Sequence, residues 1–210
     1  RTPLYEYQKQ GVDFIHQAGG TCILSDAMGV GKTIQALYYV KEANFNRVLV
    51  VCPASVTYKW KDEAERWTDF DAEVIATGKQ HLTVAPIQIM SYAIMTARAR
   101  ELAEITWDLI IYDECHAIKN TNAKRTKGAQ MIPAKHKLFL SGTPMLNRPI
   151  ELFPTLNMID PMQYSNYWAF AKRYCGAFKH KMGFWVVDGQ SNLEELKSKL
   201  SSIMLRRTKQ

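Results

Sequence analysis

The stretch SDAMGVGKT, residues 25–33, has most of the residues of a phosphate-binding loop. The general pattern of such loops is G-x-x-x-x-G-K-[ST], and Asp26 stands where the first glycine would be. Lys32 can reach the β- and γ-phosphates of a nucleotide, and the Thr33 hydroxyl can bind Mg²⁺. The spacing therefore predicts a nucleotide site, and the alternative is a glycine-rich turn before a core helix.

The sequence on either side of this loop supplies the setting that the motif requires. Residues 21–24 read as a short buried strand, and residues 32–43 place apolar side chains at helical spacing. Backbone N–H groups between such a strand and helix can surround an anion, and the helix N-terminus adds a partial positive charge. Asp26 fits this loop if its backbone needs no positive φ. The candidate nucleotide-binding residues of the loop are Asp26, Met28, Gly29, Val30, Gly31, Lys32 and Thr33.

Two adjacent acids, Asp113 and Glu114, follow the apolar run DLIIY of residues 108–112. A carboxylate after a buried strand can meet Mg²⁺ held at the phosphate loop, usually through water, and Asp113 is expected in this role. Glu114 is placed to orient or deprotonate an attacking water. With Lys32 these acids form the candidate catalytic set, and Thr33 with Asp113 forms the candidate metal set. The alternative is that the two acids simply begin a loop.

A third polar segment, SGTP at residues 141–144, ends another apolar run. The hydroxyls of Ser141 and Thr143 can bond His116 and respond to the γ-phosphate. Taken alone, the segment is an ordinary strand-to-turn signal.

The elements that must position these residues alternate between strand-like and helix-like patterns. Strands are expected at 21–25, 47–52, 73–76, 87–90, 108–112 and 137–140. Helices are expected near 5–17, 32–43, 55–67, 92–104, 122–131, 150–158, 165–175 and 192–204. This alternation predicts an α/β fold with a mostly parallel sheet covered on both faces. The polar segments then fall at the carboxyl ends of the strands, where such sheets bind ligands.

After Asp160 the pattern changes, because GFWVVDG at 183–189 reads as a hairpin fragment between two helical segments. We therefore expect a sheet lobe at residues 1–159 and, packed on it, an accessory helical and hairpin segment at residues 160–210.

The composition is that of a globular protein, with 210 residues of which 47% are hydrophobic. No apolar run approaches the roughly 18 residues of a membrane span, and the first residues do not resemble a signal peptide. The four cysteines lie far apart and form no C-x-x-C pair. We therefore expect reduced thiols inside a cell and neither a zinc site nor a disulfide framework.

The net charge of +7 is unevenly distributed. Residues 117–187 contain eleven lysines and arginines but only two acids, and the rest of the chain is slightly acidic. No acid occurs in residues 117–140 or 161–187. Such asymmetry favours a polyanionic partner, although basic and solvated helix faces would give the same composition.

Seven segments in order resemble the first motor lobe of Swi/Snf-type ATPases, which are superfamily-two, helicase-like translocases on double-stranded DNA. The segments are YQKQGV (7–12), DAMGVGKT (26–33), VVCPASVTYKW (50–60), IMSY (89–92), DECHAIKN (113–120), SGTPMLN (141–147) and MLRRTK (204–209). The resemblance covers essentially the whole chain, and in that family Asp is usual where Asp26 stands. It implies a RecA-like three-layer sandwich that binds ATP and Mg²⁺ and works with a second RecA-like lobe of the same polypeptide.

The resemblance also implies roles at single positions. Gln8 would recognise adenine, Lys32 and Thr33 would bind phosphate and Mg²⁺, and Asp113 and Glu114 would be the metal partner and the catalytic acid or base of a DEAH-like box. Coupling of the nucleotide to DNA would fall to His116, Ser141 and Thr143. The segments FAKRYCGAF, at 170–178, and GFWVVDGQSNLEELKSKL, at 183–200, are similar to the annealing-helicase, fork-remodelling branch.

The expected DNA side begins with PASVTYKW, which follows a strand and opens a helix that Ser55 or Thr57 can cap. By resemblance, Lys59 and Ser91 are candidate contacts to the DNA backbone. Trp60 and Trp67, seven residues apart, are read as core anchors rather than as base-stacking platforms. Further candidates are the basic residues Lys119, Lys124, Arg125 and Lys127, of which Lys124 and Arg125 are preferred.

Contacts to phosphates carry no sequence information, so the expected motor binds double-stranded DNA without sequence preference. It would work inside a cell with DNA, in a eukaryotic nucleus or in a bacterial or virus-infected cytoplasm. Two other readings stay open at this point. One is an independent P-loop phosphotransferase, and the other is a non-catalytic nucleic-acid-binding module with a relic loop.

Overall fold

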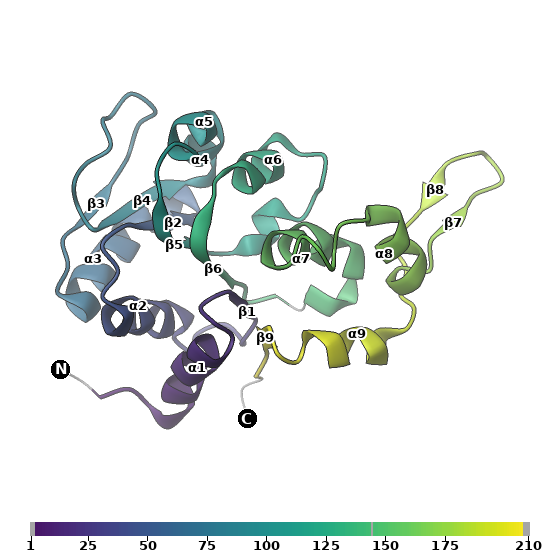
Figure 1. Cartoon of the computed structure of the whole chain (residues 1–210), viewed down its shortest axis with the longest axis horizontal. Coiled ribbons are helices and arrows are strands. Elements are labelled where there is room, and N and C mark those ends of the chain that lie inside the picture. The colour runs from purple at the N-terminus through teal and green to yellow at the C-terminus, as the bar shows by residue number, and fades with distance from the viewer. Residues whose placement is uncertain (1–2, 144, 208–210) are drawn as a thin grey trace.

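The computed structural model describes residues 3–143 and 145–207 and contains a seven-stranded sheet in the order β3-β4-β2-β5-β6-β1-β9 (Figure 1). Every neighbouring pair in this sheet is parallel. Its strands are β1 Cys22–Leu24, β2 Val48–Cys52, β3 Ala72–Val74, β4 Ile87–Ser91, β5 Trp107–Tyr112, β6 Ala134–Leu140 and β9 Met204–Leu205. The predicted α/β fold with a mostly parallel sheet is confirmed.

Two layers of helices cover the two faces of the sheet (Figure 1). The α-helices are α1 Glu6–Gln17, α2 Lys32–Ala43, α3 Thr57–Thr68, α4 Tyr92–Ala97, α5 Ala99–Leu102, α6 Lys124–Met131, α7 Phe153–Ile159, α8 Tyr167–Tyr174 and α9 Leu193–Leu200. Short 3₁₀ helices occupy Ala54–Val56, Cys115–Ile118, Met145–Asn147 and Pro149–Leu152. Helices α1 to α3 pack on one face, and residues of α4 to α9 belong to the cluster on the other.

Burial on both faces explains the unbroken apolar runs of the central strands. In β2, Val48 and Val50 belong to one hydrophobic cluster, while Leu49 and Val51 belong to the other. Successive side chains of a strand point to opposite faces, so a strand between two helical layers needs an apolar residue at every position. The whole of β2 is accordingly buried.

The largest difference from the sequence prediction lies at the C-terminal end. The helix expected at 192–204 ends at Leu200, and Met204–Leu205 form β9, which pairs in parallel with β1. The N–H groups of Ile23 and Ser25 donate to the carbonyls of Ile203 and Leu205, both at 2.8 Å. The error arose because apolar spacing alone does not distinguish a two-residue strand from the last turn of a helix.

Helix boundaries differ elsewhere by smaller amounts. The helix expected at 92–104 is two helices, α4 and α5, separated at Arg98. The helices expected to start at 55 and 150 begin with short 3₁₀ turns. Ends of helices are the least certain part of any assignment from a pattern.

The segment after residue 160 packs on the sheet lobe and also extends away from it. Phe170 and Tyr174 of α8, with Leu196 and Leu200 of α9, are buried in the same hydrophobic cluster as one face of the sheet. Between these helices, β7 Phe178–Lys179 and β8 Trp185–Val186 form an antiparallel hairpin that projects from the body of the molecule (Figure 1). The hairpin is confirmed, whereas the division of the chain at residue 160 stays a proposal.

No described helix is both long enough and apolar enough to cross a membrane. The four cysteines are buried free thiols: Cys22, Cys52, Cys115 and Cys175. Pro144 of the SGTP segment and the last two residues of MLRRTK, 208–209, lie outside the described residues.

Candidate nucleotide-binding site

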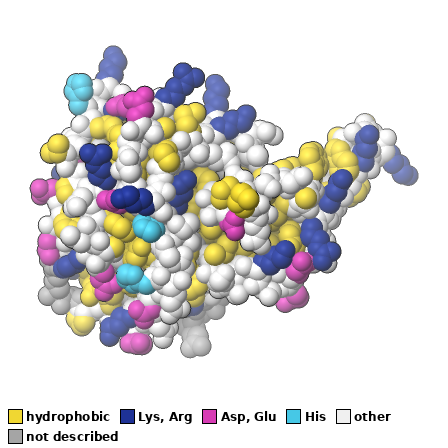
Figure 2. Space-filling view, in the orientation of Figure 1, with side chains coloured by type: hydrophobic (Ala, Val, Ile, Leu, Met, Phe, Trp, Pro, Cys, Tyr) yellow, Lys and Arg dark blue, Asp and Glu magenta, His cyan; other side chains and the backbone are white. Residues whose placement is uncertain are grey.

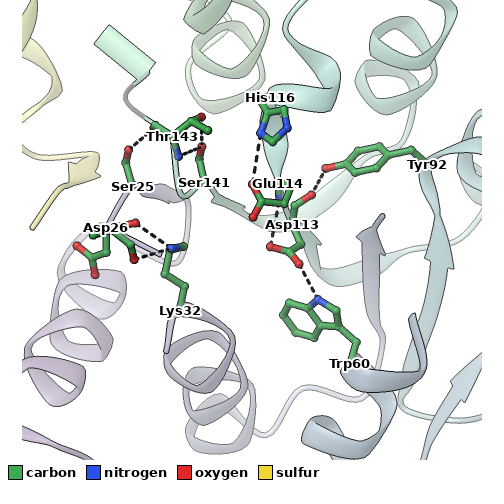
Figure 3. A network of polar contacts seen from close by, with 11 residues as sticks. Ser25, Asp26, Lys32, Trp60, Tyr92, Asp113, Glu114, His116, Ser141 and Thr143 are labelled. Carbon is green, nitrogen blue, oxygen red and sulfur yellow. Dashed lines mark hydrogen bonds and ion pairs between the residues drawn. The ribbon is translucent and has the colours of Figure 1, made fainter. Parts of the chain in front are cut away.

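The three polar segments meet at the carboxyl ends of three adjacent strands (Figure 3). The phosphate-like loop follows β1, the acidic pair follows β5, and the SGTP segment follows β6, which lies between those two strands. The strand register places the ends of β1, β5 and β6 level with one another, because Leu24 is opposite Leu140 and Tyr112 is opposite Phe139. The edge of a parallel sheet where strands end is the usual ligand-binding position of such folds.

Glycine is required at two positions of the loop. Gly29 and Gly31 have φ of 81° and 77°, in the left-handed region that residues with a Cβ rarely adopt. At Gly31, which is the N-cap of α2, a Cβ would also lie 2.5 Å from Nε2 of Gln8. Asp26 is not among the described non-glycine residues with positive φ. An aspartate therefore fits at the first position of this loop, as the sequence predicted.

The side chain of Lys32 turns back over the preceding loop. Its Nζ donates to the carbonyl oxygens of Asp26 at 2.8 Å and Ala27 at 3.1 Å (Figure 3). Burial lowers the pKa of the Lys32 ammonium, and the carboxylates of Glu114, Asp26 and Asp113 oppose that shift. The Lys32 ammonium is thus enclosed by the loop and lies near the two candidate catalytic acids, Asp113 and Glu114.

Asp113 accepts three hydrogen bonds (Figure 3). Its Oδ2 accepts from Trp60 Nε1 at 2.8 Å, its Oδ1 accepts from the backbone N–H of Glu114 at 2.9 Å, and its backbone carbonyl accepts from the Tyr92 hydroxyl at 2.6 Å. Burial raises the pKa of the Asp113 carboxyl, while the bond from Trp60 acts in the opposite direction. Donors on both oxygens favour the charged form and fix the direction of the carboxylate.

Trp60 explains much of this arrangement, and the sequence revealed only half of its role. Its indole is 2% exposed, so the prediction of a core anchor is confirmed. The same ring donates to Asp113, which lies 53 residues further along the chain. Trp60 and Tyr92 are the positioning residues that sequence reasoning missed. The signal available was that VTYKW comes shortly after β2, which neighbours β5, and that IMSY ends β4, which lies on the other side of β2.

Glu114 has a backbone conformation that is uncommon for a residue with a side chain, with φ 48° and ψ 54°. It directly precedes the 3₁₀ turn Cys115–Ile118. Its Oε2 lies 3.3 Å from Nδ1 of His116 (Figure 3). Such left-handed residues concentrate at functional sites because the surrounding structure must hold them there.

Ser141 and Thr143 bond each other rather than His116. The Ser141 hydroxyl lies 3.0 Å from Oγ1 of Thr143 and accepts from the Thr143 N–H at 3.2 Å. The Ser25 hydroxyl donates to the Thr143 carbonyl at 3.4 Å, which ties the segment to the end of β1. Among the described residues His116 pairs with Glu114, so the expected bond from these hydroxyls to His116 is wrong for this conformation.

A cavity of about 420 Å³ joins the loop to the acidic pair. Its lining residues are Met28, Gly29, Gly31, Lys32, Thr33, Ile34, Val56, Lys59, Trp60, Glu63, Asp113 and Glu114. Met28 and Lys59 are exposed at this cavity, so Lys59, expected at DNA, also faces the candidate nucleotide site. Gln8 is buried beside Gly31, where its Oε1 accepts from the Tyr5 N–H at 3.0 Å.

Asp26 is fully buried and paired with an arginine from the other end of the chain. Its Oδ1 accepts from the Arg207 backbone N–H at 2.8 Å and from Nε at 3.1 Å, and its Oδ2 accepts from Nη2. The same guanidinium donates to Gln35 Oε1 at 3.1 Å and to the Tyr7 carbonyl. Sequence reasoning gave Arg207, within the segment MLRRTK, no role of its own and missed this pair.

The DNA-contact candidates lie on exposed or strand-end positions. Ser91 caps α4, because its hydroxyl accepts from the Ile94 N–H at 3.3 Å. Ser55 is exposed in the 3₁₀ turn before α3, and Lys124 is exposed on α6. The Arg125 guanidinium lies 5.6 Å from the centre of the Tyr92 ring. Their contacts with DNA stay predictions.

The profile of one protein family, described as the SNF2-related domain, matches residues 7–210. The chain belongs to the SNF2-related domain family. It is similar to DNA annealing helicase and endonuclease ZRANB3 of Homo sapiens, at 35% identity over 100% of this chain and 21% of the relative. It is also similar to the SWI/SNF-related matrix-associated actin-dependent regulator of chromatin subfamily A-like protein 1 of Bos taurus, at 37% identity over 98% and 23%.

Solved structures agree with this membership. The Sulfolobus solfataricus SWI2/SNF2 ATPase core in complex with double-stranded DNA superposes with a TM-score of 0.82 and 29% identity, over 99% of this chain and 45% of that one. The RecA-like fold and the likeness to an annealing helicase are thus confirmed for this SNF2-related domain. The chain spans only about a fifth of the length of the two curated relatives.

Proposed function

We propose that this SNF2-related domain is the ATP-binding lobe of a motor that couples ATP hydrolysis to movement along double-stranded DNA. The observation that carries the proposal is the shared cavity, which brings Lys32 and Thr33 of the loop together with Asp113 and Glu114. A relic loop would have no reason to keep both acids oriented beside it. In a eukaryote such a motor would work in the nucleus, and in a bacterium or virus-infected cell in the cytoplasm.

The residues of the cavity fit Mg²⁺ and ATP. The two left-handed glycines leave room for backbone N–H groups to face phosphate oxygens, and Lys32 supplies the cation. The oxygens of Thr33 and Asp113 are of the kind that Mg²⁺ prefers. Gln8, packed against Gly31, is the candidate for contact with adenine. Bound Mg-ATP would supply the phosphoryl group that water attacks and the metal charge that stabilises its oxygens.

The chain's own groups then have separate tasks. Lys32 exchanges the carbonyls of Asp26 and Ala27 for phosphate oxygens. Trp60 and the Glu114 N–H keep the Asp113 carboxylate directed and oppose the rise in its pKa that burial causes. Glu114 accepts a proton from the attacking water, and its left-handed backbone presents the carboxylate beside His116. His116, Ser141 and Thr143 remain the candidates that relay nucleotide state towards DNA.

Among the described residues, those that line the cavity include no arginine. The transition state of phosphoryl transfer is stabilised in many enzymes by an arginine, which contributes roughly 10³–10⁵ in rate. In the family that the sequence resembles, this arginine comes from a second RecA-like lobe. Arg207 is engaged with Asp26, so it is not available for that task. We therefore expect the 210-residue chain to bind Mg-ATP weakly and to hydrolyse it at a negligible rate, with or without DNA.

The test compares phosphate release by the 210-residue chain with release by a longer protein that includes a second lobe, each with and without duplex DNA. We expect DNA-stimulated release from the longer protein only. In it, Lys32→Ala should abolish nucleotide binding, whereas Glu114→Gln should keep Mg-ATP affinity and lose hydrolysis. Lys61→Ala, at a partly exposed lysine near Glu65 on α3, is the matched control.

Each rival reading has its own signature in this experiment. Rapid turnover by the short chain, unaffected by DNA, would identify an independent P-loop phosphotransferase. DNA binding without any nucleotide binding or turnover in the longer protein would identify a module with a relic loop. Unchanged hydrolysis in Lys32→Ala would end the motor proposal.

A further inference from the structure

The β7–β8 hairpin exposes aromatic and basic side chains at the far end of the molecule from α1 to α3 (Figure 1). The space-filling view shows lysine and arginine side chains and apolar surface along this projection (Figure 2). Residues 161–187 contain Lys172, Arg173, Lys179 and Lys181 but no acid. The hairpin is outside the nucleotide cavity, and neither the cavity nor the fold explains its surface.

One face of the hairpin is a row of rings. Phe178 lies opposite Val186, and alternation along each strand places His180 and Phe184 on that same face. Phe178 and Phe184 are each 53% exposed. The rings of His180 and Phe184 stack at 4.6 Å with an interplanar angle of 15°. Exposed rings grouped in this way mark a binding surface, because single scattered apolar side chains are the norm elsewhere.

The opposite face combines rings with cations. Trp185 lies opposite Lys179, and the Lys172 ammonium lies 5.7 Å from the centre of the Trp185 ring. Trp168 of α8 packs against Trp185 with ring centres 5.1 Å apart. These two tryptophans brace the base of the hairpin on α8. The row of Phe178 and Phe184 is therefore presented on a supported element. Lys181 is exposed in the turn that follows His180, whereas Lys179 lies on the opposite face with Trp185.

The chemistry of this surface selects its ligand. Lysines without neighbouring acids favour a polyanion, and exposed phenylalanine rings favour flat apolar groups. A nucleic acid offers both, but a duplex hides the faces of its bases in the stack. We propose that the β7–β8 hairpin binds unpaired nucleotides, with bases stacked on Phe178 and Phe184 and a phosphate near Lys181 of the turn. This site is independent of the nucleotide cavity, so its test does not depend on ATP.

The test measures binding of the full 210-residue chain to a labelled oligothymidine and to a blunt duplex of equal length, by fluorescence anisotropy without nucleotide. Phe178→Ala with Phe184→Ala should weaken binding to the single strand at least about fivefold, the lower end for loss of a stacked base. Binding to the duplex should stay within about twofold, because its base faces are not available to stack. Val84→Ala, at an exposed apolar residue of a distant loop, is the control.

Conservative variants separate stacking from other causes. Tyrosine at both positions keeps a π-face and should retain single-strand affinity, whereas leucine keeps apolar area and should lose it as alanine does. Lys181→Ala should lower the slope of log affinity against log salt by about 0.7 if one phosphate contact of the single strand is lost. All substituted rings are half-exposed, and far-ultraviolet circular dichroism checks that each variant is folded.

Three results would overturn the proposal. Unchanged single-strand affinity in the double alanine variant would show that the rings serve another partner, such as a protein. Full affinity in the leucine variant would show an apolar contact without stacking. Equal weakening for the blunt duplex and the single strand would show that the hairpin does not distinguish unpaired nucleotides.

Discussion

Removal of the Arg207 side chain should destabilise the domain more than any other single loss of an ion pair described above. Asp26 is fully buried, and its two carboxylate oxygens accept from the Arg207 backbone N–H, Nε and Nη2. Arg207→Ala removes two of these three donors and leaves the charge of Asp26 buried. The bonds from Arg207 to Gln35 and to the Tyr7 carbonyl are lost as well.

The expected cost follows from the burial of the pair. Removal of one partner from a buried ion pair typically costs about 3–5 kcal/mol. The Arg207 side chain is 24% exposed, so water can reach part of the site, and the lower end, about 3 kcal/mol, is expected. That change equals a factor of roughly 150 in the folding equilibrium, a large part of the typical stability of a domain.

Urea unfolding followed by tryptophan fluorescence measures this cost. Arg173→Ala is the matched control, because it breaks an arginine–carboxylate pair with Glu195 that is exposed and screened by solvent. The double variant Asp26→Leu with Arg207→Met should recover most of the loss, since no charge then remains buried. The reasoning is refuted if Arg207→Ala costs no more than Arg173→Ala, or if the double variant is less stable than Arg207→Ala.

Trp60→Phe keeps a buried ring but removes the donor to Asp113 Oδ2. In the two-lobed protein, the Mg²⁺ concentration that gives half-maximal ATP hydrolysis should therefore rise about tenfold or more. An unchanged Mg²⁺ titration would contradict the positioning role of Trp60. Burial raises the pKa of the Cys22 thiol from 9.0 to about 12, so the unfolded chain ionises first and the free energy of unfolding should fall as the pH rises from 9 towards 12. Iodoacetamide at pH 8.5 should accordingly label Cys22 in urea only, and fast labelling of the native protein would show the thiol to be accessible. Duplex DNA should bind without sequence preference and with an affinity that falls steeply with salt. Reversal of charge at Lys124 and Arg125 should weaken this binding. Unchanged affinity would show that these two residues lie on a solvated helix face.

The residues of the candidate nucleotide site could be predicted from the sequence because its parts are local. The loop residues from Asp26 to Thr33 are consecutive, and Asp113 and Glu114 directly follow an unmistakable apolar strand. A parallel sheet then brings the ends of β1 and β5 to one edge, whatever the details of the helices. Only the order of the strands was needed to place these groups together.

The groups that orient the site are not local, and this is why they were missed. Trp60 bonds Asp113 across 53 residues, and Arg207 bonds Asp26 across 181. A buried tryptophan satisfies the same apolar pattern whether or not its N–H has a functional partner. The hydroxyls of Ser141 and Thr143 had several possible partners at the same strand edge, and the choice between them depends on rotamers that a sequence does not reveal.

The pairing of β9 with β1 also bears on the order in which the domain can assemble during synthesis. Asp26 emerges 181 residues before Arg207, and at about 5–20 residues per second this corresponds to an interval of roughly 10–40 s. During that time β1 can pair with β6 but is an open edge on its other side, and the carboxylate at the start of the loop lacks its arginine. The nascent domain therefore completes the candidate nucleotide site only after Arg207 has been made.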